Sequence, residues 1–142
     1  MNSPIALITG ASRGLGKNAA QHLARQGSDL ILTYRSGAEE AASLVREIEA
    51  LGRRAVALPL DVSESGRFPA FAADVKAALG RVWQRETFDH LVNNAGMGVH
   101  ASFAETTEQD FDALVDVHLK GPFFLTQALL PLIADGGRIV NV

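Results

Sequence analysis

A glycine-rich stretch near the start of the chain constrains the fold more than any other feature. The segment Thr9-Gly10-Ala11-Ser12-Arg13-Gly14-Leu15-Gly16 follows an apolar run at residues 5–8, which predicts a buried parallel strand. Apolar residues at helical spacing follow, at positions 15, 19, 20, 23 and 24. Glycine permits a tight turn, and the free N–H groups at a helix start attract phosphate. The order of strand, glycine loop and helix therefore predicts a site for a phosphate-bearing ligand.

The rest of the chain continues this alternation of strand and helix. Further strands are predicted at residues 29–34, 55–60, 88–93 and 138–142. Further helices are predicted at residues 41–51, at 68–82, and from Thr106 or Thr107 to about Ala134. Such alternation predicts an α/β fold of right-handed βαβ units. We expect a Rossmann-type doubly wound parallel sheet of order 3-2-1-4-5, with its ligand where the first and fourth strands meet.

Composition narrows the class of protein. A length of 142 residues suits one domain, and the net charge of −3 does not favour a nucleic-acid or membrane surface. There is no cysteine, no histidine pair at ligand spacing, and no apolar stretch long enough to span a bilayer. The first predicted strand begins at Ile5, which leaves no room for a signal peptide. We therefore expect a cytoplasmic protein that uses neither metal, nucleic acid nor membrane.

Two motifs resemble one enzyme family. The loop spacing Gly-x-x-x-Gly-x-Gly differs from the common dinucleotide fingerprint, but it resembles the loop of the classical short-chain dehydrogenase/reductase family. The extended branch of that family has glycine where Arg13 stands. Asn93-Asn94-Ala95-Gly96, at the end of the fourth predicted strand, matches the family's N-N-A-G motif in full. The resemblance implies an oxidoreductase that moves hydride between a nicotinamide cofactor and a small-molecule ketone or secondary alcohol.

The end of the second predicted strand indicates which nicotinamide cofactor is used. Tyr34-Arg35-Ser36 stands where an NAD-preferring site has an acidic residue for the ribose hydroxyl. A guanidinium can bind a 2′-phosphate bidentately, and Arg13 could approach the same phosphate. Both arginines resemble the family's NADP-preferring pattern, so we expect NADP(H) as cofactor. The alternative is that both are solvated surface arginines.

Two further pairs of residues complete the implied cofactor site. Asp61-Val62 resembles the family's adenine-binding pair, although Asp61 could equally cap the third helix. Asn93-Asn94-Ala95-Gly96 resembles the segment under the nicotinamide ribose, and an ordinary Asn-rich turn is the alternative. The implied cofactor-binding residues are Gly10, Ser12, Arg13, Gly14, Leu15, Gly16, Tyr34, Arg35, Ser36, Asp61, Val62, Asn93, Ala95 and Gly96.

His118 is the one candidate catalytic residue. It stands where the family has the asparagine of an Asn-Ser-Tyr-Lys tetrad. Helical spacing places it on an inward face with Phe111, Leu114 and Val115, and a core histidine bonded to backbone is the alternative. Pro122 has no N–H, so the carbonyl of His118 loses its helical partner. In the family a main-chain carbonyl at this kink holds a water, and histidine would preserve that carbonyl.

The remaining catalytic residues of the family have no counterpart in the 142 residues. The only tyrosine is Tyr34, and there is no Tyr-x-x-x-Lys. We therefore expect residues 1–142 to form an NADP(H)-binding Rossmann domain, truncated after the fifth strand and inactive alone. The alternative is a non-catalytic dinucleotide-binding or interaction module. The apolar segment 123–133 predicts core and helix–helix contact, and in the family this helix implies a homo-oligomer.

Overall fold

Five parallel strands form the centre of the computed structural model, which describes residues 2–142. In space the strands follow the order β3-β2-β1-β4-β5, and every neighbouring pair is parallel. The predicted Rossmann-type sheet of order 3-2-1-4-5 is therefore confirmed. The strands are β1 (Ile5–Ile8), β2 (Asp29–Tyr34), β3 (Ala55–Pro59), β4 (Phe88–Asn93) and β5 (Ile133–Asn141).

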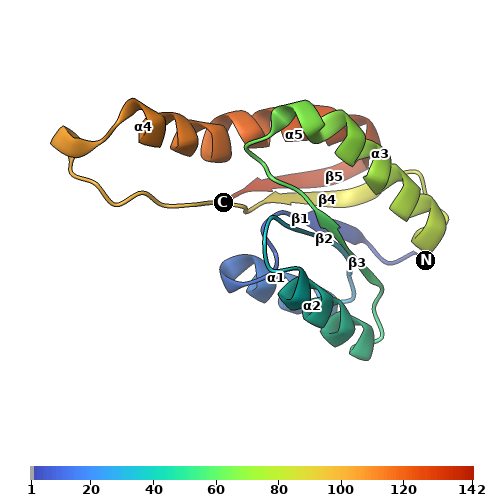
Figure 1. Cartoon of the computed structure of the whole chain (residues 1–142). Helices are drawn as coiled ribbons and strands as arrows, with labels where there is room; N and C mark the ends of the chain where they lie inside the picture. The colour runs from blue at the N-terminus through green and yellow to red at the C-terminus, as the bar shows by residue number, and fades with distance from the viewer. Residues whose placement is uncertain (1) are drawn as a thin grey trace.

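Helices cover both faces of this sheet (Figure 1). On one face lie α1 (Gly14–Arg25) and α2 (Ala38–Ala50), and on the other lie α3 (Phe68–Ala78) and α5 (Gly121–Leu129). Successive residues of β1 enter different cores: Ile5 and Leu7 pack with α3 and α5, whereas Ala6 and Ile8 pack with α1 and α2. Because both of its faces are buried, β1 reads in sequence as an unbroken apolar run.

The long fourth helix that the sequence predicts is present from Glu108 to Leu132, but it is not a regular α-helix throughout, and it ends before Ala134. A single turn at Phe103–Glu105 (η3) precedes α4 (Glu108–Val115), which Thr107 caps by accepting a hydrogen bond from the Asp110 N–H at 3.1 Å. A π-helical turn, Asp116–Lys120 (η4), then leads into α5, and a final 3₁₀ turn (η5) covers Leu130–Leu132. The Gly121 N–H reaches back five residues to the Asp116 carbonyl. This wider turn comes just before Pro122, which cannot donate a helical hydrogen bond.

Three other predicted boundaries need correction. The third predicted helix ends at Ala78, and residues 79–82 belong to a π-helical turn, Leu79–Trp83 (η2). The strand predicted at 55–60 ends at Pro59, one residue early. The fifth strand begins at Ile133 rather than Arg138, but its pairing is irregular: Phe88 pairs with Ile133 and His90 already pairs with Arg138. Gly136, with φ of +81°, lies in the inserted bulge, where a positive φ suits glycine.

Candidate active site

A groove of about 670 Å³ lies at the carboxyl ends of the strands, where α1 begins beside β4. This is the edge at which parallel α/β sheets bind ligands. Its lining joins the glycine loop to the ends of β2, β3 and β4. The lining residues are Gly10, Ser12, Arg13, Leu15, Arg35, Ser36, Leu60, Asp61, Val62, Asn94, Ala95, Gly96, Met97 and Val117.

The glycine loop leaves the start of α1 open toward a ligand. Gly10 and Gly14 have φ of +62° and +60°, a left-handed conformation that other residues rarely adopt. Arg13 is the N-cap residue of α1, and within residues 2–142 no side chain accepts a hydrogen bond from the first turn. The first N–H groups of a helix carry partial positive charge and need acceptors. An anion such as a phosphate would satisfy them.

Hydrogen bonds fix the glycine loop to the end of β4. The hydroxyl of Thr9 accepts from the N–H groups of Asn94 and Ala95, at 3.0 and 2.9 Å. The side-chain amide of Asn94 donates to the carbonyls of Thr9 and Gly10, at 3.1 and 3.2 Å. Gly16 lies against the same amide, since a Cβ there would come within 2.5 Å of Asn94 Nδ2. The loop and the N-N-A-G segment therefore form one rigid floor.

The end of the groove beside β2 carries positive charge. Arg35 is exposed, with 71% of its side chain accessible, and its Nε lies 3.6 Å from Asp61 Oδ2. Asp61 Oδ1 accepts from the N–H and hydroxyl of Ser63, at 2.9 and 2.6 Å. Partial burial raises the pKa of Asp61, but the two Ser63 bonds and the Arg35 charge outweigh burial, so the pKa lies below its usual range. Asp61 is therefore an ionised acceptor at neutral pH.

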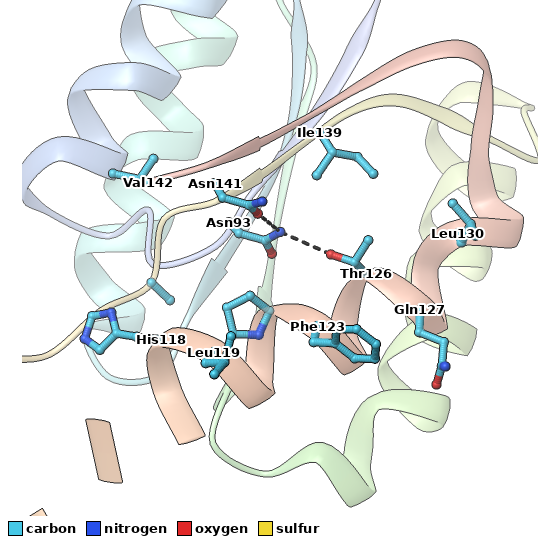
Figure 2. A pocket seen from close by; sticks show the side chains of 12 residues that line it. Asn93, His118, Leu119, Phe123, Thr126, Gln127, Leu130, Ile139, Asn141 and Val142 are labelled. Atoms are coloured by element: carbon cyan, nitrogen blue, oxygen red, sulfur yellow. Dashed lines mark hydrogen bonds between the residues drawn. The ribbon is translucent and has the colours of Figure 1, made fainter. Parts of the chain in front are cut away.

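A second cavity of about 660 Å³ lies between β5 and α5, beyond Ala95 (Figure 2). Its wall is largely apolar, and polar side chains come both from the strands (Asn93, Asn141) and from η4 and α5 (His118, Thr126, Gln127). Asn93 is buried, and its amide donates to Thr126 Oγ1 at 3.2 Å and to Asn141 Oδ1 at 2.8 Å. The lining residues are Asn93, Ala95, His118, Leu119, Pro122, Phe123, Thr126, Gln127, Leu130, Ile139, Asn141 and Val142.

His118 lies at the rim of this second cavity, not in the core. Its Nε2 is 2.7 Å from the Met97 carbonyl oxygen and 3.2 Å from the Met97 nitrogen. The prediction that it faces inward with Phe111 is wrong, because both side chains are exposed and Val117 is the buried residue of this turn. The buried residues of this stretch, Val117, Gly121, Leu125 and Leu129, recur every four positions, so the face that enters the core passes through Val117 and not through His118. The alternative, a core histidine bonded to the backbone, is right about the backbone contact and wrong about the core, because His118 is exposed.

Four predicted cofactor residues do not line the first groove. Gly14 shapes the loop, and Gly16 packs beneath it. Tyr34 ends β2, and its carbonyl accepts a hydrogen bond from the Leu60 N–H at 2.9 Å. Asn93 points to the second cavity instead. Sequence reasoning missed Leu60, Asn94, Met97 and Val117. Alternation along β4 could have found Asn94, because its neighbour Asn93 faces the other side.

Within residues 2–142, no three histidine or acidic side chains lie close enough together to hold a metal ion. None of the helices in that part of the chain is long and apolar enough to cross a bilayer.

Comparison with known proteins shows which family has this arrangement. The family model described as short chain dehydrogenase matches residues 4–142. The hydroxynaphthalene reductase-like protein Arp2 of Metarhizium brunneum is 34% identical over 136 residues, which cover 96% of this chain and 49% of that protein. The chain spans about half the length of the curated relatives it matches, including 51% of a Pestalotiopsis microspora short-chain dehydrogenase/reductase.

Solved structures agree with the sequence match. The angucycline C-6 ketoreductase LanV with bound NADP superposes with a TM-score of 0.92 at 35% identity, covering 97% of this chain and 54% of that one. A blue fluorescent protein from a metagenomic library, in complex with NADPH, gives a TM-score of 0.87 at 34% identity, covering 99% and 55%. The fold, the sequence motifs and the family-model match over residues 4–142 all point to the same family. This chain belongs to the short-chain dehydrogenase family.

Proposed function

We propose that residues 1–142 form the NADP(H)-binding domain of an oxidoreductase that moves hydride between the cofactor and a ketone or secondary alcohol. The observation that carries the proposal is the groove, in which the uncapped start of α1 and two arginines line one continuous surface. A helix start favours a pyrophosphate, and an arginine favours a terminal phosphate. NADP(H) carries both groups.

Each part of the groove suits one part of NADP(H). The pyrophosphate would lie on the first turn of α1, where Gly10 and Gly14 allow close backbone approach. Arg35 and Arg13 would meet the 2′-phosphate, and ionised Asp61 would accept from the adenine amine. Ala95 and Gly96 would lie under the nicotinamide ribose, because Gly96 has no side chain to fill that end of the groove.

Hydride chemistry requires more than this groove. NADPH, when bound, supplies the hydride, and the protein must place the cofactor and deliver a proton to the developing alkoxide. The 142 residues contain no Tyr-x-x-x-Lys motif. In the short-chain dehydrogenase family this motif supplies the proton. LanV is named a ketoreductase and Arp2 a hydroxynaphthalene reductase-like protein, which supports a carbonyl substrate here. His118 could act near the substrate only through the second cavity, which it lines.

Assembly and location are part of the same proposal. Phe111, Leu119 and Phe123 are exposed along α4, η4 and α5, which suits a homo-oligomer built through these helices. The chain has no cysteine, which suits a reducing compartment such as the cytoplasm. We expect neither nucleic acid nor membrane as a partner, given a net charge of −3.

The proposal is tested by titrating NADPH and NADH into the protein and into an Arg35→Ala variant. The wild type should bind NADPH more tightly than NADH. Loss of a charge-assisted hydrogen bond costs about 1.5–3 kcal/mol when buried. Arg35 is exposed and partly engaged by Asp61, so we expect the low end, about a tenfold loss of NADPH affinity. NADH affinity should change little, because NADH has no 2′-phosphate.

Arg25→Ala is the matched control, since Arg25 is exposed in the last turn of α1 and does not line the groove. It removes the same charge and should leave both affinities unchanged. Equal NADPH and NADH affinities in the wild type would contradict the assignment of Arg35. NADPH binding without turnover, in protein made from the complete coding sequence, would favour the non-catalytic module.

A further inference from the structure

The contact between His118 and Met97 joins residues that lie 21 positions apart in the chain. His118 belongs to the π-helical turn η4, and Met97 follows the end of β4. Both Gly96 and Met97 line the first groove, whereas His118 lines the second cavity. The imidazole therefore lies at the rim of the second cavity (Figure 2) and contacts the backbone of Met97, which lines the first groove.

The two distances at Nε2 identify which ring nitrogen carries the proton. A single nitrogen either donates or accepts, so it cannot bond the Met97 carbonyl and the Met97 N–H together. At 2.7 Å from the carbonyl oxygen, an unprotonated Nε2 would set two lone pairs against each other. The longer contact, 3.2 Å to the nitrogen, is the weaker one. His118 therefore donates from Nε2 to the Met97 carbonyl, and Nδ1 carries the lone pair of the neutral ring.

Gly96 fixes the position of the same ring from the other side. A Cβ built on Gly96 would lie 2.9 Å from His118 Cε1 and 3.7 Å from Nδ1. Its φ is not in the left-handed region, so the missing side chain is required by space and not by backbone conformation. Gly96 and His118 are thus one packing unit, in which the ring occupies the place of a side chain.

We propose that His118 is a positioning residue that sets the Gly96–Met97 wall of the cofactor groove by donating a hydrogen bond from Nε2 to the Met97 carbonyl. The inference rests on the proposed NADP(H) site for its functional consequence. Its structural part, the protonated Nε2, does not depend on any cofactor. His118 acts through main-chain atoms, so its effect is on binding geometry and not on proton transfer to the substrate.

The first test reads the tautomer without cofactor. The protein is labelled with ¹⁵N, and the ring nitrogens of His118 are assigned by their absence in His118→Gln. We expect the neutral ring to show a protonated Nε2 and an unprotonated Nδ1. A protonated Nδ1 would overturn the proposal, whatever the protein binds.

The second test measures NADPH affinity across a set of variants. His118→Ala should weaken binding by about two- to tenfold, the range for one lost hydrogen bond. His118→Gln should restore affinity to within about twofold, because its terminal amide can donate from near the place of Nε2. Lys120→Ala, on the same turn and exposed, is the control and should match the wild type.

A double-mutant cycle separates positioning from general loosening of the structure. Gly96→Ala should weaken NADPH binding by displacing the ring, and the added methyl should be tolerated once the ring is removed. Gly96→Ala combined with His118→Ala should then bind no worse than His118→Ala alone. Additive losses, or a Gln variant as weak as Ala, would overturn the proposed role. If the wild type binds no NADPH, the proposed function fails while the tautomer measurement still decides the hydrogen bond.

Discussion

Asp29→Asn should destabilise the protein strongly, although the two side chains have nearly the same shape. Asp29 opens β2, and the residue is only 2% exposed. Its Oδ1 accepts from the Arg54 N–H at 2.9 Å, and its Oδ2 accepts from the indole N–H of Trp83 at 2.8 Å. The Nε atoms of Arg53 and Arg54 lie 3.8 and 3.5 Å from the same carboxylate. One buried group thus joins the start of β2 to Arg54, the residue before β3, and to Trp83 of η2.

The size of the effect follows from these contacts. An amide has one acceptor oxygen, so its NH₂ group must face either the Trp83 indole N–H or the Arg54 N–H, and both are donors. The variant loses one hydrogen bond to a charged acceptor, which contributes about 1.5–3 kcal/mol. It also loses the attraction of two nearby guanidinium groups. We expect the free energy of unfolding to fall by about 3 kcal/mol, with no contribution from a cavity.

Urea denaturation measures this change. Trp83 is the only tryptophan of the chain, so its fluorescence follows the region that Asp29 holds. The midpoint should fall while the slope with urea is unchanged, since the same surface is exposed on unfolding. Asp74→Asn, on the exposed side of α3, is the matched control and should change stability by less than about 0.5 kcal/mol. An equally small change for Asp29→Asn would refute the reasoning.

Two other predictions concern pH and catalysis. Burial raises the pKa of Asp89. Hydrogen bonds from Arg85 and from the Ile5 N–H, together with the charges of Arg85 and His90, lower the pKa by more than burial raises it, so the net shift is downward. Its stabilisation is therefore fully present above the ordinary value of about 3.9 and is lost as pH falls through the lowered folded value. Urea midpoints between about pH 2 and 6 should show the gap between wild type and Asp89→Asn closing only in that acid range. NADPH oxidation by residues 1–142 alone, against a panel of ketones, should not exceed background, and clear turnover would contradict the expected need for a separate proton donor.

The centre of the sheet could be predicted from sequence because β1 and β2 are buried almost throughout. Runs such as Ile5–Ile8 leave few alternatives to a parallel strand, and the glycine loop fixed the position of the first crossover. The family and the strand order followed from the same residues. These features depend on local sequence and on general rules of chain connection.

The errors lie where one residue of spacing changes the outcome. The buried positions Val117, Gly121, Leu125 and Leu129 recur every four residues, whereas the predicted face follows positions 111, 114, 115 and 118, so the prediction for His118 is one position out. The bulge before Arg138 likewise hid the start of β5. Asn94, rather than the predicted Asn93, contacts the glycine loop, a distinction that side-chain alternation along β4 can supply. The positions of the π-helical turn and of the bulge depend on tertiary contacts.

The length of β2 separates two tasks of the molecule. Asp29 stands at its first residue and Tyr34, next to Arg35, at its last, so the stabilising carboxylate and the cofactor end lie roughly 16 Å apart. Changes at such a distance without shared partners add independently. Stabilising substitutions around Asp29, Arg54 and Trp83 can therefore be accumulated first, as a reserve against the destabilising changes that altered cofactor specificity brings. A chain built this way can change its cofactor preference at one end of a strand while the other end keeps it folded.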